Sequence, residues 1–203
     1  MALALLLIVG CSYASAAVDK VTSSTQLTLD TPSRAYPVAT LLDVGIPTLN
    51  DGLYLTDEDD TVFPEVRYAE AIYFSNQLGK VLEKSGAWGA IRVTPSDDVI
   101  MDLYISGTIY QSDGETLDLE ITARDSSGTK WFSQRYKQTT GKYAYDRRLK
   151  SLGDPFQNLF IRIANDLLNY REKTISDQRA EELRTISELR FAKQFSPEAF
   201  DSY

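Results

Sequence analysis

Apolar and polar residues alternate through residues 102–136, which run DLYISGTIYQSDGETLDLEITARDSSGTKWFSQRY. Alternation with a period of two is typical of strands that bury one face and expose the other. Two turn sequences, SDG at 112–114 and DSSG at 125–128, divide the run into three parts. These residues therefore predict a three-stranded antiparallel meander with one buried face.

The turn lengths also predict how the strands pair. A three-residue first turn with a left-handed glycine sets Ile105 beside Ile121 on the buried face. A four-residue second turn is expected to set Tyr136 beside Leu117. Opposite charges then meet across the outer face, in the predicted pairs Asp102–Arg124 and Asp118–Arg135.

Helical segments and two further strands are predicted around the meander. Residues 64–85 begin with proline, are followed by glycine, and carry an apolar face of Tyr68, Ala71, Phe74, Leu78, Val81 and Leu82. Residues 154–172 predict a second amphipathic helix, 176–194 a charged third helix, and 38–45 and 90–94 short strands. The expected fold class is α+β: a mixed sheet with the three-stranded antiparallel meander packed on helices, followed by a C-terminal helical segment.

The composition excludes several classes of function. The chain has 203 residues, a net charge of −8 and no histidine. Its negative charge argues against nucleic-acid binding, which needs clustered Lys and Arg. The lack of histidine removes Ser–His–Asp and Cys–His catalysis and His-ligated zinc. Residues 56–61 (TDEDDT) have the spacing of a calcium loop, but Val62 replaces the required glycine, so neither a metal nor a cofactor is expected.

The amino terminus has the features of an exported lipoprotein. Residues 1–10 are uncharged and almost wholly apolar, and the only cysteine, Cys11, follows the sequence IVG. This arrangement resembles the lipobox of bacterial lipoproteins, whose cysteine carries palmitate and other acyl chains after signal-peptide cleavage. Ser12 resembles the residue at this position in lipoproteins of the outer membrane, with the domain facing the periplasm. The alternatives are an ordinary signal cleaved near Ala14 or Ala17, or a buried core cysteine.

These signals divide the chain into four parts. Residues 1–10 are the expected lipoprotein signal peptide, and residues 11–37, rich in Ser, Thr and Ala, are the expected lipidated tether. Residues 38–172 hold the α/β domain. Residues 173–203 form a helical extension that is expected to be truncated, because a new helix start, Ser-Pro-Glu, comes shortly before its last residue.

Turn glycines and one tryptophan carry a resemblance to known envelope domains. A Ser-Gly turn ends the helix at 85–86, a second Ser-Gly ends a strand at 106–107, and residues 125–131 have the hairpin pattern D-x-x-G-x-x-W. The chain thereby resembles the α/β domain of the curli secretion-channel lipoprotein, of lipoprotein activators of penicillin-binding proteins, and of the amino-terminal part of the Tol-system periplasmic protein. It is also similar to uncharacterised proteobacterial lipoproteins. The resemblance implies a protein that binds other proteins or assembles into envelope machines, and not an enzyme.

The outer face of the meander carries the candidate partner-binding residues, which are Tyr104, Tyr110, Trp131 and Arg135. Aromatic residues and arginine dominate binding hot spots, so this face is expected to dock an envelope protein. One alternative is that the 154–172 helix covers this face. Another is that the aromatics stack on peptidoglycan or a different envelope glycan.

Two further roles stay open at this stage. An enzyme would have to use paired carboxylates such as Asp118 and Glu120, although any solvated strand face shows such alternation. Residues 154–194 offer a second docking surface or a contact between copies in a homo-oligomer, and the alternative for residues 156–168 is ordinary core packing. The expected function is a non-enzymatic, lipid-anchored cell-envelope protein that acts as an adaptor or assembly factor, attached to the membrane through Cys11.

Overall fold

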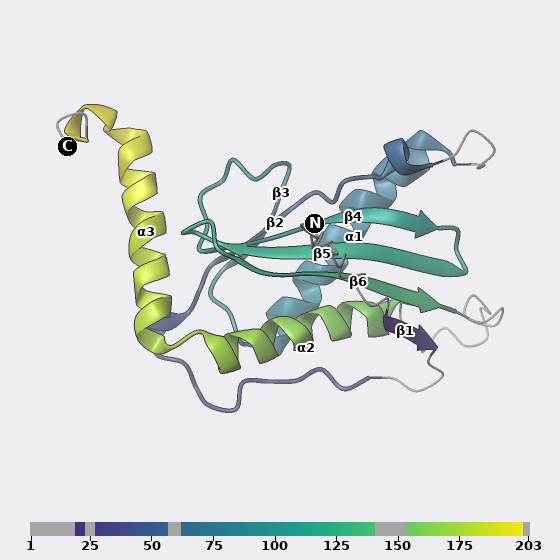
Figure 1. Cartoon of the computed structure of the whole chain (residues 1–203), viewed down its shortest axis with the longest axis horizontal. Coiled ribbons are helices and arrows are strands. Elements are labelled where there is room, and N and C mark those ends of the chain that lie inside the picture. Colours follow the sequence, from purple (N-terminus) through teal and green to yellow (C-terminus); the bar gives the residue numbers. More distant parts are fainter. Residues whose placement is uncertain (1–18, 23–26, 57–61, 141–153, 201–203) are drawn as a thin grey trace, which may run out of the picture.

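A mixed sheet with helices on one face forms the core of the protein (Figure 1). The structure is a computed structural model, and it describes residues 19–22, 27–56, 62–140 and 154–200. The expected signal peptide, Cys11 and most of the acidic loop lie outside these residues. Within the described ranges, no helix is long and apolar enough to cross a bilayer.

The described residues contain six strands, three α-helices and three short 3-10 helices. The strands are β1 (Asp19–Thr22), β2 (Val44–Pro47), β3 (Ile91–Thr94), β4 (Leu103–Ser112), β5 (Thr116–Asp125) and β6 (Lys130–Thr139). The α-helices are α1 (Pro64–Ser85), α2 (Gln157–Thr174) and α3 (Asp177–Phe195). The 3-10 helices are η1 (Val38–Thr40), η2 (Leu53–Leu55) and η4 (Pro197–Ala199).

The strands form one sheet, with the order β1-β6-β5-β4-β2-β3 among the described residues. β4, β5 and β6 are consecutive antiparallel neighbours, so the predicted meander is confirmed. β2 lies parallel to both β3 and β4, and β1 lies parallel to β6. The sheet is therefore mixed and followed by helices, as the expected fold class requires.

α1 and α2 pack against each other and against the same face of the sheet. The rings of Phe74 in α1 and Phe160 in α2 lie 6.1 Å apart. Fully buried apolar side chains of β4 and β5 line the sheet side of this core, namely Leu103, Ile105, Ile109, Leu117, Leu119 and Ile121. The prediction that the meander buries one face under the 64–85 helix is confirmed.

One expected core residue of α1 is exposed. Tyr68 was predicted on the apolar face, but it is 60 % exposed. Its neighbour Arg67 occupies the inward position in this turn and is only 3 % exposed. The Arg67 guanidinium donates a hydrogen bond to the carbonyl oxygen of Asp51 at 3.4 Å and pairs with Glu70 at 3.4 Å, which explains why a charged residue is tolerated there.

Local signals set the helix ends. α1 begins at Pro64 and ends before Gly86, which adopts a left-handed conformation with a φ of 65°. α3 begins after Ser176, whose hydroxyl accepts a hydrogen bond from the N–H of Arg179 at 3.1 Å. The predicted 64–85 and 176–194 helices therefore form where the sequence places them, within one residue at each end.

The predicted strand register is wrong by two residues. Ile105 pairs with Ala123 instead of Ile121, and Tyr136 pairs with Leu119 instead of Leu117. The first hairpin turn is longer than expected, because the Asp113 carboxylate accepts N–H bonds from residues 115 and 116, and β4 contains a bulge between residues 109 and 111. A shift of two residues keeps the same side chains on the buried face, so the predicted arrangement of the sheet and helix layers is unaffected.

Two predicted strand limits also differ from the structure. The strand expected at 38–45 overlaps β2 only at residues 44–45: residues 38–40 form the 3-10 helix η1, and β2 continues to Pro47. The Ser-Gly pair at 106–107 lies inside β4 and does not end it. A Cβ atom on Gly107 would lie 2.5 Å from the carbonyl oxygen of Glu120, so glycine here permits the close approach of β5.

The described part of the expected tether is attached to the domain. Residues 27–36 lie along α2, and the backbone N–H of Leu27 donates to the side chain of Asn158 at 2.8 Å. β1 adds a strand to the edge of the sheet beside β6. Residues 19–22 and 27–36 of the expected tether are therefore paired with the domain in the structure.

Tyr136 provides a test of the packing between β6 and α2. Its side chain is 1 % exposed, its hydroxyl donates to Asp166 at 2.9 Å, and burial raises its pKa. Tyr136→Phe is expected to lower the free energy of unfolding by about 1–2 kcal/mol at pH 7, because the buried hydrogen bond is lost. The raised pKa means that Tyr136 contributes stability below the unfolded-state pKa of about 10, and that this contribution is lost as the pH rises. Urea unfolding should show the gap between wild type and Tyr136→Phe narrowing above about pH 10, and a gap that widens there would contradict the assignment.

Candidate functional site

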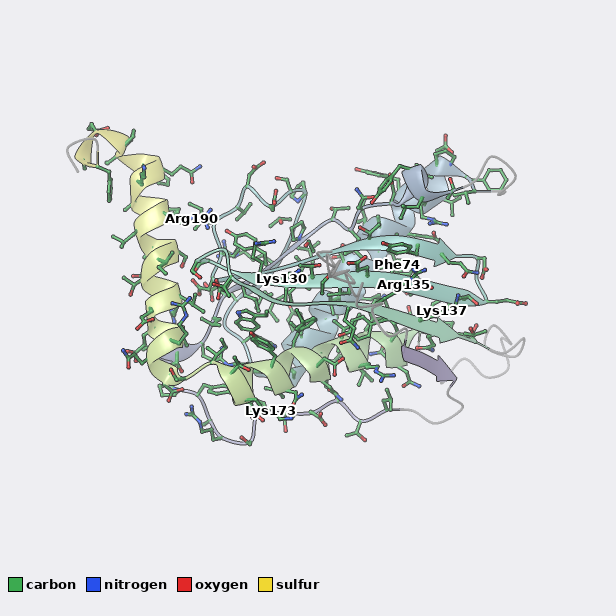
Figure 2. The ribbon with its side chains drawn as sticks, viewed as in Figure 1. Phe74, Lys130, Arg135, Lys137, Lys173 and Arg190 are labelled. Atoms are coloured by element: carbon green, nitrogen blue, oxygen red, sulfur yellow. The ribbon has the colours of Figure 1, made fainter. Side chains whose placement is uncertain are left out.

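The sheet face opposite α1 and α2 presents an ordered polar and aromatic surface. We call it the outer sheet face and define it by the residues Tyr104, Tyr110, Asp118, Glu120, Arg135 and Lys137. Figure 1 shows α1 passing behind the meander, and Figure 2 labels Arg135 and Lys137 on β6. These side chains come from alternate positions of β4, β5 and β6, so the pleat places them on one side of the sheet.

A β-bulge in β4 brings two consecutive residues to this face. The register shifts between Ile109 and Gln111, which leaves Tyr110 without a cross-strand partner. The Tyr110 hydroxyl donates to the Glu120 carboxylate at 2.8 Å, and the amide oxygen of Gln111 accepts from Lys137 at 3.0 Å. The bulge therefore aims both side chains at the outer sheet face.

Asp118 is the buried centre of the face. It is only 1 % exposed, although it lies on the side of the sheet away from the helices. Arg135 donates two hydrogen bonds to its carboxylate, from Nε at 2.7 Å and from Nη2 at 3.1 Å, and Lys137 Nζ lies 3.4 Å away. This bidentate pairing raises the pKa of Arg135. The predicted pairing of Asp118 with Arg135 is confirmed, even though Arg135 is in register with Glu120.

Tyr110 and Arg135 stack on each other. The Arg135 guanidinium lies 3.9 Å from the centre of the Tyr110 ring, a cation–π distance. Glu120 accepts hydrogen bonds from Tyr110 and from the Ser133 hydroxyl at 2.8 Å, and the bond to Glu120 raises the pKa of Tyr110. The Tyr110 and Arg135 side chains are thus held in place before any ligand arrives, which lowers the entropy lost on binding.

The structure places the four sequence-predicted site residues in three environments. Tyr110 and Arg135 are in contact, and Tyr104 lies on the same face with its hydroxyl accepting the N–H of Met101 at 2.9 Å. Trp131 is not on this face. Its ring stacks on Tyr170 of α2 with centroids 5.1 Å apart, and it is only 6 % exposed. The alternative that the 154–172 helix covers the outer face is not what the structure shows, because α2 lies on the opposite face of the sheet and covers Trp131 there.

A second bulge explains the displacement of Trp131. The β5–β6 register shifts between Ala123 and Arg124, so that Arg124 pairs with Lys130. Trp131 is the unpaired extra residue of this bulge, and its ring lies on the side of the helices, where its indole Nε1 donates to the Asp125 carboxylate at 3.1 Å. Strict alternation along β6 cannot reveal such a bulge.

The predicted pair Asp102–Arg124 does not form. Asp102 is 4 % exposed, accepts the N–H of Asp43 at 2.8 Å, and accepts a hydrogen bond from the Ser187 hydroxyl of α3. Burial raises the pKa of Asp102. Arg124 instead donates to the carbonyl oxygen of Gly128 at 2.7 Å. The two-residue register shift separates the pair and sets Tyr104 opposite Arg124.

Asp118 and Glu120, the carboxylates considered for catalysis, already have partners. Asp118 is engaged by Arg135 and Lys137, and Glu120 by Tyr110 and Ser133. In the described part of the chain, no group of His, Cys, Asp or Glu side chains could hold a metal ion. The arrangement offers recognition chemistry: an aromatic ring, a cation and carboxylates at fixed positions. Lys137 and Gln111 were not among the predicted site residues. Of the two, only Lys137 has a sequence signal, its strand-period spacing from Arg135.

The ion pair between Asp118 and Arg135 is expected to contribute to stability. Arg135→Ala should lower the free energy of unfolding by about 2–3 kcal/mol, because the buried Asp118 carboxylate keeps only the longer contact to Lys137. Arg124→Ala on the same face is the matched control, and its exposed side chain should cost less than about 0.5 kcal/mol. Urea denaturation measures both. Equal losses in the two variants would show that Asp118 does not depend on Arg135.

No family model and no curated protein matches this chain. Similar solved structures include the hypothetical protein CT253 from Chlamydia trachomatis, with 11 % identity, a TM-score of 0.40, and coverage of 63 % of this chain and 96 % of that one. A PelC dodecamer from Paraburkholderia phytofirmans has 13 % identity and a TM-score of 0.35, and the match covers 72 % of this chain and 88 % of that one. The lipoprotein GNA1162 from Neisseria meningitidis has 10 % identity and a TM-score of 0.25, and the match covers 66 % of this chain and 99 % of that one. At TM-scores this low, the likenesses carry no argument about function.

Proposed function

We propose that the protein is a non-enzymatic, lipid-anchored component of the bacterial cell envelope that docks a protein partner on its outer sheet face. The observation that carries this proposal is the stacked pair of Tyr110 and Arg135 on the side of the sheet away from α1 and α2. Tyr and Arg are enriched in binding hot spots because they contribute contact area and hydrogen bonds at a low entropic cost.

The hydrogen bonds of the face support a docking role. Arg135 is held by Asp118 and Tyr110 by Glu120, so the two side chains are ordered before a partner binds. Ser106 and Ser133 are exposed on the same side of the meander, which gives a partner access to its centre. A protein that meets this surface would bury a preformed cation–π pair surrounded by polar groups.

The amino-terminal sequence supports attachment to a membrane. Cys11 follows an apolar run and a glycine, which is the arrangement that lipoprotein processing requires. A diacylglyceryl and an amide-linked chain together hold a domain on a membrane durably, whereas one chain does not. We place the protein at the outer membrane facing the periplasm, on the basis of Ser12.

A pull-down with in-cell cross-linking tests this function. Wild type is compared with Cys11→Ala, which removes the anchor, and with Arg135→Ala, which removes the stacked cation. Lys130→Ala is the matched control, because Lys130 is an exposed basic residue of the same strand. We expect one envelope protein to be recovered with wild type and Lys130→Ala and to be reduced about tenfold with Arg135→Ala, as for a hot-spot residue.

Folding and the glycan alternative are controlled in the same experiment. Circular dichroism of each purified variant shows that a lost partner does not reflect unfolding, and Arg135→Lys keeps the charge without the bidentate geometry. Recovery of peptidoglycan fragments in place of a protein would favour the glycan-binding alternative. Equal recovery of the partner with Arg135→Ala and Lys130→Ala would overturn the outer sheet face as the docking site.

A further inference from the structure

An extended segment ahead of the domain is held on α2 by a regular series of side chains. We call residues 27–36 the strap. Three polar side chains of α2 accept backbone N–H groups of the strap: Asn158 from Leu27 at 2.8 Å, Asn165 from Asp30 at 2.9 Å, and Glu172 from Ser33 at 2.7 Å. Asn165 also donates to the carbonyl oxygen of Thr28 at 3.0 Å.

The spacing of these contacts matches two backbone periods. The acceptors recur every seven residues of α2, which is about 10.5 Å along a helix axis. The strap donors recur every three residues, which is about 9.3 Å in an extended polyproline-II chain. Because the distance between successive acceptors on α2 nearly equals the distance between successive donors on the strap, one face of α2 can bind the strap along its whole length.

The far end of the strap is fixed by a buried arginine. The guanidinium of Arg171 lies 4.1 Å from the ring centre of Tyr36 and is only 2 % exposed. Its Nη2 donates to the carbonyl oxygen of Thr40 at 2.6 Å. Arg34 forms an ion pair with Asp177 at the start of α3. The strap is therefore tied to α2 at both ends and in the middle.

The strand that precedes the strap is also attached. β1 pairs in parallel with β6, with Asp19 opposite Tyr136 and Thr22 opposite Thr139. Asp19 is eight residues after Cys11, whereas Pro37 is 26 residues after it. Fully extended, these lengths span about 28 Å and about 90 Å.

We propose that β1 and the strap act as a fixed-length connection, which holds the domain with the β6 edge of its sheet within about 28 Å of the membrane surface. The partner of this edge is a lipid surface, reached through the acyl chains on Cys11. This inference rests on the lipid anchor of the proposed function. It sets which end of the domain faces the bilayer and how far from the bilayer the outer sheet face can meet its partner.

The attachment of the strap is tested first, without a membrane. Hydrogen exchange of the full chain should show the amides of Leu27, Asp30 and Ser33 protected. Asn165→Ala with Glu172→Ala should speed exchange at Asp30 and Ser33 about tenfold, while β4–β6 stay protected. The control pair is Asn169→Ala with Lys173→Ala, two exposed positions of α2 that make no hydrogen bond to the strap in the described residues. Unprotected strap amides in wild type would overturn the proposal.

The distance between the domain and the membrane is then measured on vesicles of phosphatidylethanolamine and phosphatidylglycerol. A dye on Lys80→Cys, an exposed position of α1, reports energy transfer to acceptor lipids, and its thiol is unique because the Cys11 thiol is acylated. The release variant carries Lys20→Pro, Val21→Pro, Asn158→Ala, Asn165→Ala and Glu172→Ala, which leaves the strap attached from Arg34 onward. The matched control carries Ser15→Pro, Ala16→Pro, Asn169→Ala, Lys173→Ala and Thr174→Ala, whose α2 positions are exposed.

We expect energy transfer to fall about twofold in the release variant, because the chain between Cys11 and its first attached residue lengthens from 8 to 23 residues. The mean end-to-end length of a flexible chain then grows from about 16 to about 26 Å. The control should match wild type. Equal transfer in the release and control variants, with both bound to vesicles, would overturn the fixed-length connection while leaving the anchor intact. Vesicle binding that is the same in wild type and Cys11→Ala would instead refute the anchor, and with it the proposed function, while the exchange result would still report the strap.

Discussion

Replacing Trp131 by alanine is expected to lower the free energy of unfolding by about 3–5 kcal/mol, the usual range for removing a large buried aromatic side chain. The ring stacks on Tyr170 at 5.1 Å, lies 6.4 Å from Trp88, and donates its indole N–H to Asp125. Alanine removes all three interactions and leaves a cavity between β6 and α2. Urea denaturation followed by circular dichroism measures the loss.

The neighbouring Lys130 provides the control. It is exposed, so Lys130→Ala should change stability by less than about 0.5 kcal/mol. The loss of unfolding free energy in Trp131→Phe should lie between those of Trp131→Ala and Lys130→Ala, because phenylalanine keeps a stacked ring but loses the hydrogen bond to Asp125. A Trp131→Ala variant that unfolds like wild type and yet loses an envelope partner would contradict the structure and restore Trp131 to the binding surface.

A second large effect is expected at Gly52, which supports β4 next to its bulge. Gly52 has a left-handed backbone, with a φ of 69° and a ψ of 15°. A Cβ atom there would lie 1.8 Å from the carbonyl oxygen of Ile109, so the backbone itself would have to move. Gly52→Ala should lower the free energy of unfolding by about 3–5 kcal/mol, from the strained φ together with the clash.

Gly86→Ala separates the cost of the left-handed backbone from the cost of the steric clash. Its φ of 65° and ψ of 16° nearly equal those of Gly52, but an added Cβ atom would meet nothing within 4 Å. Gly86→Ala should therefore cost only about 1 kcal/mol, the conformational part alone. Thermal and urea unfolding of the two variants compare them directly. Equal losses would mean that residues 50–52 do not lie against β4 as the structure has them.

The layers of the fold could be predicted because they depend on local sequence periods. Pro64 and Gly86 delimit α1, and the alternation of Leu117, Leu119 and Ile121 identifies the buried face of β5. The register could not be predicted in the same way. It depends on turn conformation, and the Asp113 carboxylate lengthens the first turn by bonding two backbone N–H groups.

The candidate site was predictable in part for the same reason. Tyr110 and Arg135 belong to alternating strands, so the sequence places them on the outer face, where the structure finds them stacked. Trp131 is the extra residue of the bulge between Lys130 and Phe132, and no local sequence pattern predicts a bulge. The strap was missed because its acceptors, Asn158 and Asn165, are ordinary polar residues of an amphipathic helix until the segment that they bind is known.

Site-specific photo-cross-linking in cells tests the central claim most directly. A benzoylphenylalanine at Ser106, exposed at the centre of the outer sheet face, is compared with one at Asn76, exposed on α1. We predict a discrete cross-linked envelope protein from Ser106, little or none from Asn76, and loss of the Ser106 product when Cys11→Ala removes the anchor. Equal products from the two positions, or none from Ser106 in a chain that folds and reaches the membrane, would contradict the outer sheet face as the docking surface.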